Sequence, residues 1–298
     1  MKKLWFSILT ACFLLFSFSA KAEIVSHEFN GILYIDETTV EELEQLFEKY
    51  NYRYFRGKLD NAYPAIFLKK LPKDFAQIES QKYRNEVFIR ILAPLALKIN
   101  EELSNERHTL LRLERSLERN KTLTPEENEK LEELAVKYDY FSRNNDESRA
   151  ANLINHLKVR INVIPPSILI AVAAMETNWG FSRIAQEANS LYKEKVWYTN
   201  EGLEPLENKD DGYRFKIFDN LIDSMRSYAL TFNSNISYQN VWDTRIEAAA
   251  RQDKLIGESI AYSLAHASNL PNFVGILDYT TAFYDLFSID IGHLQRIK

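Results

Sequence analysis

The stretch from Ile164 to Asn189, IPPSILIAVAAMETNWGFSRIAQEAN, determines how the rest of the chain is interpreted. The pair Pro165–Pro166 favours the start of a helix, because proline at the first helical position has no amide proton to lose. The run from Ser167 to Met175 that follows carries no charge. Gly180 can adopt the left-handed conformation that ends many helices. We therefore predict an apolar helix that presents one carboxylate, Glu176, in its last turn.

On such a helix Glu176 shares a face with Val172 and Ala173, its neighbours at i−4 and i−3. A carboxyl group on an apolar face is a misplaced charge, half of a buried salt bridge, or an acid kept for catalysis. The salt-bridge interpretation would use Arg183 or Arg226. The residues alone leave salt bridge and catalysis evenly balanced.

Residues 1–22 have the features of a secretory signal peptide. Lys2-Lys3 forms a basic start, an apolar run extends from Leu4 to Phe18, and Ala20-Lys21-Ala22 has the small residues of a cleavage site. The apolar run is short for a membrane span, so an uncleaved signal anchor is the weaker alternative. We therefore expect a periplasmic or secreted protein with no stable membrane insertion after signal cleavage.

Cleavage would leave an acidic chain of about 276 residues. It removes three lysines and no acid, which takes the formal net charge from −5 to −8. An acidic protein has no evident electrostatic attraction for nucleic acid, so we expect no nucleic-acid partner. The chain's one cysteine, Cys12, lies in the removed segment, so neither a disulfide nor thiol chemistry is expected.

The remaining sequence predicts a mainly α fold with one small irregular or hairpin lobe. The few glycines and prolines, eight of each, favour helices over a turn-rich β fold. Residues 191–219 break the helical pattern with aromatic and acidic residues, and 213–218 alternate as a strand does. Within the longest helical signal, Pro94 should kink or divide the helix. The other expected elements are a strand or extended arm at 32–35 and helices at 38–50, 74–119, 124–140, 149–159, 219–232, 238–252, 253–267 and 271–287.

The usual catalytic motifs are absent from the sequence. The five histidines are scattered without metal-ligand spacing, and there is no nucleophile elbow, P-loop or dinucleotide fingerprint, so we expect no metal and no cofactor. What remains is Glu176 followed by a segment rich in aromatic and acidic side chains. Aromatic faces bind sugar rings, and glycosidic cleavage needs a proton donor, so this combination predicts a sugar cleft.

The residues after Glu176 carry a resemblance that decides between the two interpretations. ETNWGFSRIA at 176–185 and ANSLY at 188–192 are similar to the signature of the glucosaminidase domain of glycoside hydrolase family 73. More specifically, the chain resembles the Bax-type exported proteins of bacteria. VIPPS at 163–167, FDNLIDSMRSY at 218–228 and NSNISY at 233–238 match at the right distances.

The resemblance implies a lysozyme-like helical domain at 146–298 and an N-terminal helical extension at 23–145. It also implies an endo-β-N-acetylglucosaminidase that binds peptidoglycan strands and cleaves the β-1,4 bond after N-acetylglucosamine. Glu176 falls on the family's catalytic acid. Tyr238 falls on a recurrent tyrosine that faces the acid and orients water or the substrate's acetamido group. For substrate binding we predict Asn189, Tyr192, Trp197 and Tyr213.

Two departures from the family pattern lie in the lobe. Ser190 and Lys193 replace the second asparagine and the glycine of the family's Asn-Asn-Leu-Phe-Gly run. The family's second carboxylate comes from this lobe, where Glu194, Glu201, Glu204, Glu207, Asp210 and Asp211 compete. We favour Glu207, with Glu204 beside it, because both precede the expected strand. A lytic transglycosylase of the same fold and a non-catalytic wall-binding or scaffold protein remain the alternatives.

Overall fold

The structure is a computed structural model that describes residues 24–53, 61–140, 148–207, 211–251, 257–267 and 271–297. The expected signal peptide, and with it Cys12, lies outside the described residues. Among the described residues, no helix is both long and apolar enough to cross a membrane.

The N-terminal part begins with a hairpin and a short helix. Strands β1 (Val25–Phe29) and β2 (Ile32–Glu37) are antiparallel, and the turn between them uses the positive φ angles of Asn30 and Gly31. Helix α1 (Val40–Lys49) starts with a capping box in which the side chain of Thr39 accepts from the amide of Glu42 and the Glu42 carboxylate accepts in return.

Two further short strands connect this part to the rest of the chain. Strand β4 (Ile66–Leu68) extends the first sheet in the order β1-β2-β4 and runs parallel to β2. Strand β3 (Ala62–Pro64) pairs in parallel with β7 (His293–Gln295), near the C-terminus of the chain. The 3-10 helix η1 (Phe75–Gln77) then leads toward the longest helix.

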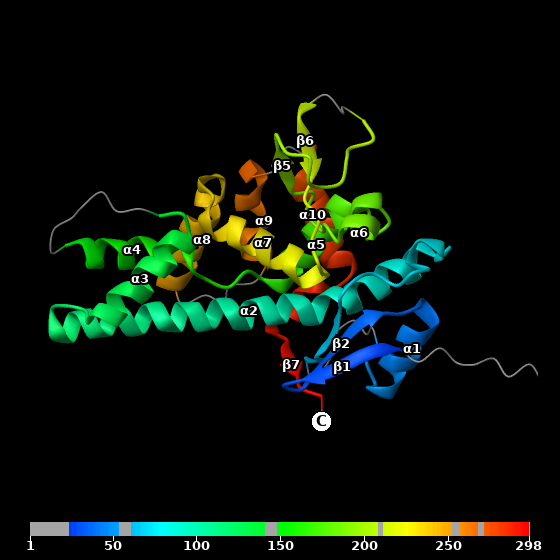
Figure 1. Cartoon of the computed structure of the whole chain (residues 1–298), viewed down its shortest axis with the longest axis horizontal. Coiled ribbons are helices and arrows are strands. Elements are labelled where there is room, and N and C mark those ends of the chain that lie inside the picture. Colours follow the sequence, from blue (N-terminus) through cyan, green and yellow to red (C-terminus); the bar gives the residue numbers. More distant parts are fainter. Residues whose placement is uncertain are drawn as a thin grey trace, which may run out of the picture.

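Helix α2 (Gln81–Asn120) runs the length of the molecule, with α1 below it and the helices that follow it in the sequence above it (Figure 1). Its first half, up to Leu103, belongs to the main hydrophobic core. Its second half packs with α3 (Pro125–Lys137) and α4 (Arg149–Arg160) in a separate, smaller core. One helix is therefore shared by two cores.

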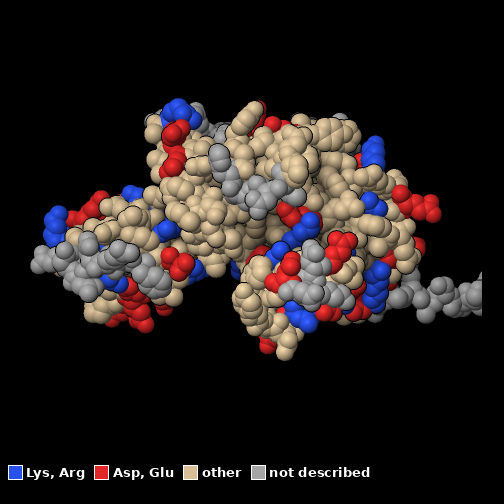
Figure 2. Space-filling view, turned by 90° about the horizontal axis from the view of Figure 1, so that it is seen from above, with Lys and Arg blue, Asp and Glu red and all other residues tan. Residues whose placement is uncertain are grey.

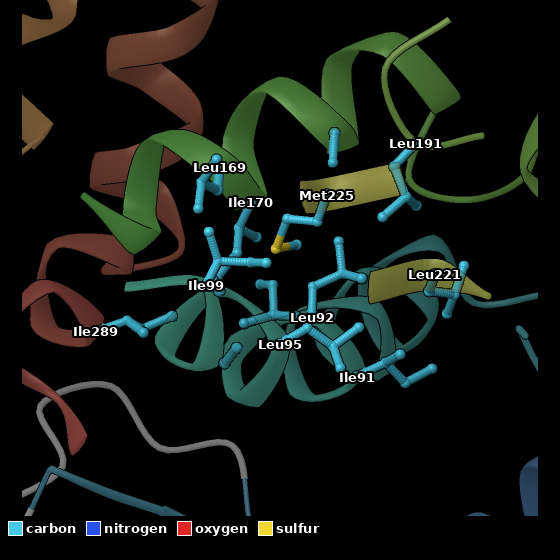
Figure 3. Packing of buried hydrophobic residues seen from close by; sticks show 14 of the residues in the cluster. Ile91, Leu92, Leu95, Ile99, Leu169, Ile170, Leu191, Leu221, Met225 and Ile289 are labelled. Atoms are coloured by element: carbon cyan, nitrogen blue, oxygen red, sulfur yellow. The ribbon is translucent and has the colours of Figure 1, made fainter. Parts of the chain in front are cut away.

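Helix α5 (Pro166–Thr177) lies in the middle of the main core, where it contacts α2, α10 (Phe273–Phe283) and the 3-10 helix η5 (Leu286–Ile291). In Figure 3, Leu169 and Ile170 of this helix face Leu92, Leu95 and Ile99 of α2 across the packed interior. Burial on all sides explains why the sequence of α5 is apolar around its whole circumference.

The start of α5 is capped by a distant residue. Its N-cap position is Pro165, which has no side-chain acceptor. Instead the carboxylate of Asp290 accepts from the backbone amide of Ser167 at 2.8 Å, from the Ser167 hydroxyl at 2.8 Å and from the amide of Gly257 at 2.7 Å. Gly257 begins α9 (Gly257–Ala261), so Asp290 joins three elements at the base of the helix.

The remaining elements surround the end of α5 that bears Glu176. Helix α6 (Arg183–Ala188) leads into a small lobe formed by the antiparallel strands β5 (Lys195–Trp197) and β6 (Tyr213–Phe215). The chain returns through α7 (Leu221–Ser234), the 3-10 helix η3 (Ile236–Tyr238), α8 (Gln239–Ala250) and the 3-10 helix η4 (Tyr262–Ala267).

The mainly α class with a hairpin lobe is confirmed, while three details differ from expectation. The N-terminal part contains a small sheet in addition to helices. Pro94 does not divide α2, because the surrounding turns from Val87 to Leu97 are held by nearly complete burial. Helix α5 ends at Asn178, which is already left-handed at φ 49°, two residues before Gly180.

Candidate active site

Glu176 lies at the edge of a pocket of about 160 Å³. The pocket's floor is apolar, and three tyrosine rings come from segments far apart in the sequence. Its lining residues are Val172, Glu176, Tyr192, Tyr228, Tyr238, Leu264 and Phe273. The sequence-predicted acid and the sequence-predicted tyrosine, Tyr238, are therefore brought together.

The chain directly after Glu176 is held by a compact turn. The Thr177 hydroxyl donates to the carbonyl of Ala173 at 2.6 Å and accepts from the amide of Gly180 at 2.9 Å. Asn178, Trp179 and Gly180 all have positive φ angles. The Trp179 ring packs against Tyr284 and Phe88, as expected for a residue that supports the helix end, with ring centroids 4.5 and 6.2 Å apart.

The carboxylate of Glu176 has one cationic partner that the sequence did not suggest. The ammonium of Lys193 lies 3.3 Å from Oε2 of Glu176, whose side chain is 20% exposed. The two arginines considered from the sequence are engaged elsewhere. Arg183 pairs with Glu187 and donates to the backbone carbonyl of Glu204. Arg226 pairs with Glu102 and Asp223. Glu176 is thus half of a salt bridge, but one at a pocket and not in the core.

The three tyrosines form a connected wall opposite Glu176. The rings of Tyr192 and Tyr228 are stacked, with centroids 4.0 Å apart and an interplanar angle of 5°. The Tyr192 hydroxyl donates to the carbonyl of Leu169 at 3.1 Å, and the Tyr238 hydroxyl donates to that of Tyr228 at 3.5 Å. Burial raises the pKa of all three hydroxyl groups, so they stay neutral and available as hydrogen-bond donors at ordinary pH.

A second carboxylate, Glu194, lies near Tyr192 and Tyr238 of the same wall. Its Oε2 accepts from the Ser227 hydroxyl at 2.7 Å, and the ammonium of Lys216 lies 3.9 Å away. Burial raises the pKa of Glu194, although Ser227 and Lys216 lower it. The negative charges of Glu176 and Glu194 both raise the pKa of Tyr238, so this hydroxyl senses both acids. Glu194 is one of the acidic residues that compete for the role of second catalytic carboxylate, and its charge acts on the tyrosine wall.

The favoured lobe acids, Glu204 and Glu207, are exposed and do not line the Glu176 pocket. Glu204 borders another pocket, of about 310 Å³, that lies within the lobe and is also lined by Tyr213. Trp197 does not line that pocket but packs beside Tyr213, with ring centroids 5.5 Å apart, and the ammonium of Lys195 lies 3.7 Å from the Tyr213 centroid. The lobe thus carries an aromatic surface distinct from the pocket at Glu176.

Asn189 has a structural role at the base of the lobe. It is the left-handed C-cap of α6, with φ 49°, and its side-chain amide donates to the carbonyl of Phe218 at 3.0 Å. The amide of Phe218 in turn donates to the carbonyl of Ala188 at 2.9 Å. These bonds fix where the lobe leaves and rejoins the helical body, and they leave the Asn189 side chain away from the pocket lining.

Lys193 and Tyr228 are site residues that the sequence reasoning did not select, and Glu194 was one of its competing lobe acids but not the favoured one. The helical spacing of Tyr228 does not say which residue it meets. Lys193 stands at a position where the family motif has glycine, and this substitution was the available signal. The φ angle of Lys193 is 49°, a value that glycine adopts easily. Side chains in that left-handed region are uncommon outside asparagine and aspartate.

Two further properties of the described residues concern metal binding and surface charge. No group of three or more histidine, cysteine, aspartate or glutamate side chains in the described ranges is placed to hold a metal ion. On the face shown in Figure 2, basic and acidic side chains are interspersed, and the described residues form no continuous basic area there.

Comparisons with known proteins found a family profile, a relative and a solved structure to which this chain is similar. The family profile for mannosyl-glycoprotein endo-beta-N-acetylglucosaminidase matches residues 151–270. Protein bax of Escherichia coli (strain K12) is 23% identical over 191 residues, which is 64% of this chain and 66% of the relative, just under two thirds of its length. The catalytic domain of the autolysin Auto from Listeria monocytogenes is 17% identical with a TM-score of 0.29, and the alignment covers 56% of this chain and 98% of that domain. The segment that contains Glu176, the tyrosine wall and the lobe is thus the one that matches the glucosaminidase family profile.

Proposed function

We propose that this protein is an exported endo-β-N-acetylglucosaminidase that cleaves the β-1,4 bond after N-acetylglucosamine in peptidoglycan. The observation that supports this most is that Glu176 and Tyr238, which match the family's acid and tyrosine, line one pocket together. The pocket offers aromatic walls for a sugar and a single carboxylate at its edge, which is the minimum that glycosidic cleavage needs.

Glu176 acts as the proton donor in this proposal. It transfers its proton to the glycosidic oxygen as the bond from that oxygen to the anomeric carbon breaks. The acetamido oxygen of the same sugar bonds to the anomeric carbon and stabilises the positive charge there. Glu176, now a carboxylate, then takes a proton from the water whose oxygen attacks that carbon, which restores the acid and opens the acetamido ring.

Tyr238 positions the groups that react. Its hydroxyl stays protonated and is anchored to Tyr228, so it can bind the attacking water or the acetamido group without taking part in proton transfer. A second carboxylate would hold the acetamido nitrogen or the water. Glu207 remains our prediction from the sequence, and Glu194 is the rival, because its charge raises the pKa of Tyr192 and Tyr238.

The proposal is tested by digestion of purified peptidoglycan, with mass spectrometry of the soluble fragments. Glu176→Gln should abolish fragment release while the variant keeps its fold, measured by circular dichroism. Glu187→Gln is the matched control, because Glu187 lies on the adjacent helix α6 and is 53% exposed in its own ion pair. Release of the same fragments by Glu176→Gln would show that Glu176 is not the acid.

Two more variants decide the second carboxylate. If Glu207 supplies it, Glu207→Gln lowers kcat by a factor of roughly a hundred to ten thousand while Glu194→Gln has a lesser effect. The reverse order would assign the role to Glu194. Equal and small effects would mean that the acetamido group reacts without a second carboxylate.

A non-catalytic wall-binding protein is the second candidate, and the salt bridge between Lys193 and Glu176 is the observation that favours it. Binding to peptidoglycan with no fragment release at any pH would favour this candidate. Anhydro-muramyl ends in the fragments would instead identify a lytic transglycosylase, in which a sugar hydroxyl replaces water.

A further inference from the structure

Lys193 occupies a backbone position that is unfavourable for a lysine. Its φ angle of 49° lies in the left-handed region, where a side chain is crowded against its own backbone and glycine is favoured. Residues held in such conformations cluster at functional sites. The side chain at this position therefore needs an explanation beyond the path of the chain.

The direction of the side chain supplies that explanation. Lys193 follows directly after Tyr192, a wall of the pocket, and its ammonium lies 3.3 Å from Oε2 of Glu176. The other titratable side chains that the structure places at the Glu176 pocket are Tyr192, Tyr228 from α7 and Tyr238 from η3. All three tyrosines are neutral at ordinary pH, and Lys193 places a positive charge beside this carboxylate.

The two partners differ in how freely they can move. The Lys193 side chain is 42% exposed, while that of Glu176 is 20% exposed. Lysine has a long flexible stem with three donors on a single charge, and it makes no bidentate contact with a carboxylate. The ammonium can therefore swing into solvent, whereas Glu176 stays on the rigid end of α5.

We propose that Lys193 is a displaceable counter-ion of Glu176, which pairs with this carboxylate in the free protein and leaves it when a glycan enters. This inference rests on the proposed function. A sugar ring in the 160 Å³ pocket would exclude water and move the ammonium outward, which frees the Glu176 carboxyl group to face the glycosidic oxygen.

The test separates the free protein from the substrate complex. The pH profile of kcat/KM reports ionisations in the free protein, and that of kcat reports those in the complex. Removing the ammonium lets Glu176 keep its proton to higher pH. In Lys193→Met the alkaline limb of the kcat/KM profile should move up by about half a pH unit, the size expected for a partly exposed ion pair. The alkaline limb of the kcat profile should not move.

Three further variants control for charge, backbone and general effects. Lys193→Arg keeps the positive charge and should keep both profiles of the original protein. Lys193→Gly suits the left-handed backbone and is the second neutral variant, should the methionine variant fold poorly. Lys137→Met is the matched control on α3, because Lys137 is also 42% exposed and paired with a glutamate, and it should move neither limb.

Several results would overturn the proposal. These are an unmoved kcat/KM limb in both neutral variants, an equal shift in Lys193→Arg, or an equal shift of the kcat limb. A protein that releases no fragments refutes the proposed function, and the ion pair is then tested by carbon-13 NMR titration of the glutamate carboxyl groups. The signal that disappears in Glu176→Gln should titrate at higher pH in Lys193→Met, and an unchanged midpoint would refute the counter-ion itself.

Discussion

Replacing Gly180 by alanine should destabilise the protein for two separable reasons. The first is backbone strain, because Gly180 has a φ angle of 75° and an L-residue there costs about 1–2 kcal/mol. The second is overlap, because a Cβ atom would lie 2.8 and 2.9 Å from the Phe88 ring and 3.0 Å from that of Phe75. Forcing a methyl group into such a packed site costs about 1–3 kcal/mol. The sum is a loss of roughly 2–5 kcal/mol in the free energy of unfolding.

Gly212 provides the matched control for this measurement. It has the same φ angle of 75°, but a Cβ atom there would meet Tyr198 at an ordinary distance of 3.5 Å. Gly212→Ala should therefore lose the strain cost alone, about 1–2 kcal/mol. Urea denaturation of both variants, followed by circular dichroism, gives the difference. If Gly180→Ala lost no more stability than Gly212→Ala, the contact with Phe88 would not restrict this turn, and the reasoning would be refuted.

Two further predictions concern the contacts that hold α5. Burial raises the pKa of Asp290 from 3.8 to about 6, so its contribution to stability is complete below pH 3.8 and is lost as the pH rises through 6. Relative to Asp290→Asn, the original protein should lose roughly 2–3 kcal/mol of unfolding free energy between pH 4 and 7, and a difference independent of pH would contradict this. Tyr192→Phe removes the donor to the carbonyl of Leu169 and should cost about 1 kcal/mol in urea denaturation; a neutral effect would mean that water replaces the bond.

Local features of the fold could be predicted from the sequence because their causes are local. The capping box of α1 follows from a threonine and a glutamate three residues apart, and that of α3 at Thr124 follows from the same spacing. The apolar character of α5 likewise predicts its burial. The three-residue strands β3 and β7 have no such signature, because their pairing joins segments more than two hundred residues apart and each is too short to show a period.

The candidate site could be predicted only in part for the same reason. Glu176 and Tyr238 were selected because they match family motifs, and the structure places them at one pocket. The partner of Glu176 could not be read from the chain, since it depends on how α6 and the left-handed residues at Asn189 and Lys193 turn the backbone back toward α5. Charge alone made Arg183 and Arg226 equally good partners, and only geometry excluded them.

The sharing of α2 between two cores has a consequence for how the enzyme-like segment can be isolated. The segment that matches the family profile ends at residue 270, yet Asp290 holds the first turn of α5 from beyond it and α2 supplies its packing surface from before it. The segment that matches the family profile is therefore shorter than the segment that must fold together. An excised fragment of 151–270 would expose the apolar side of α5 to water, and the pocket would be lost together with its flanks.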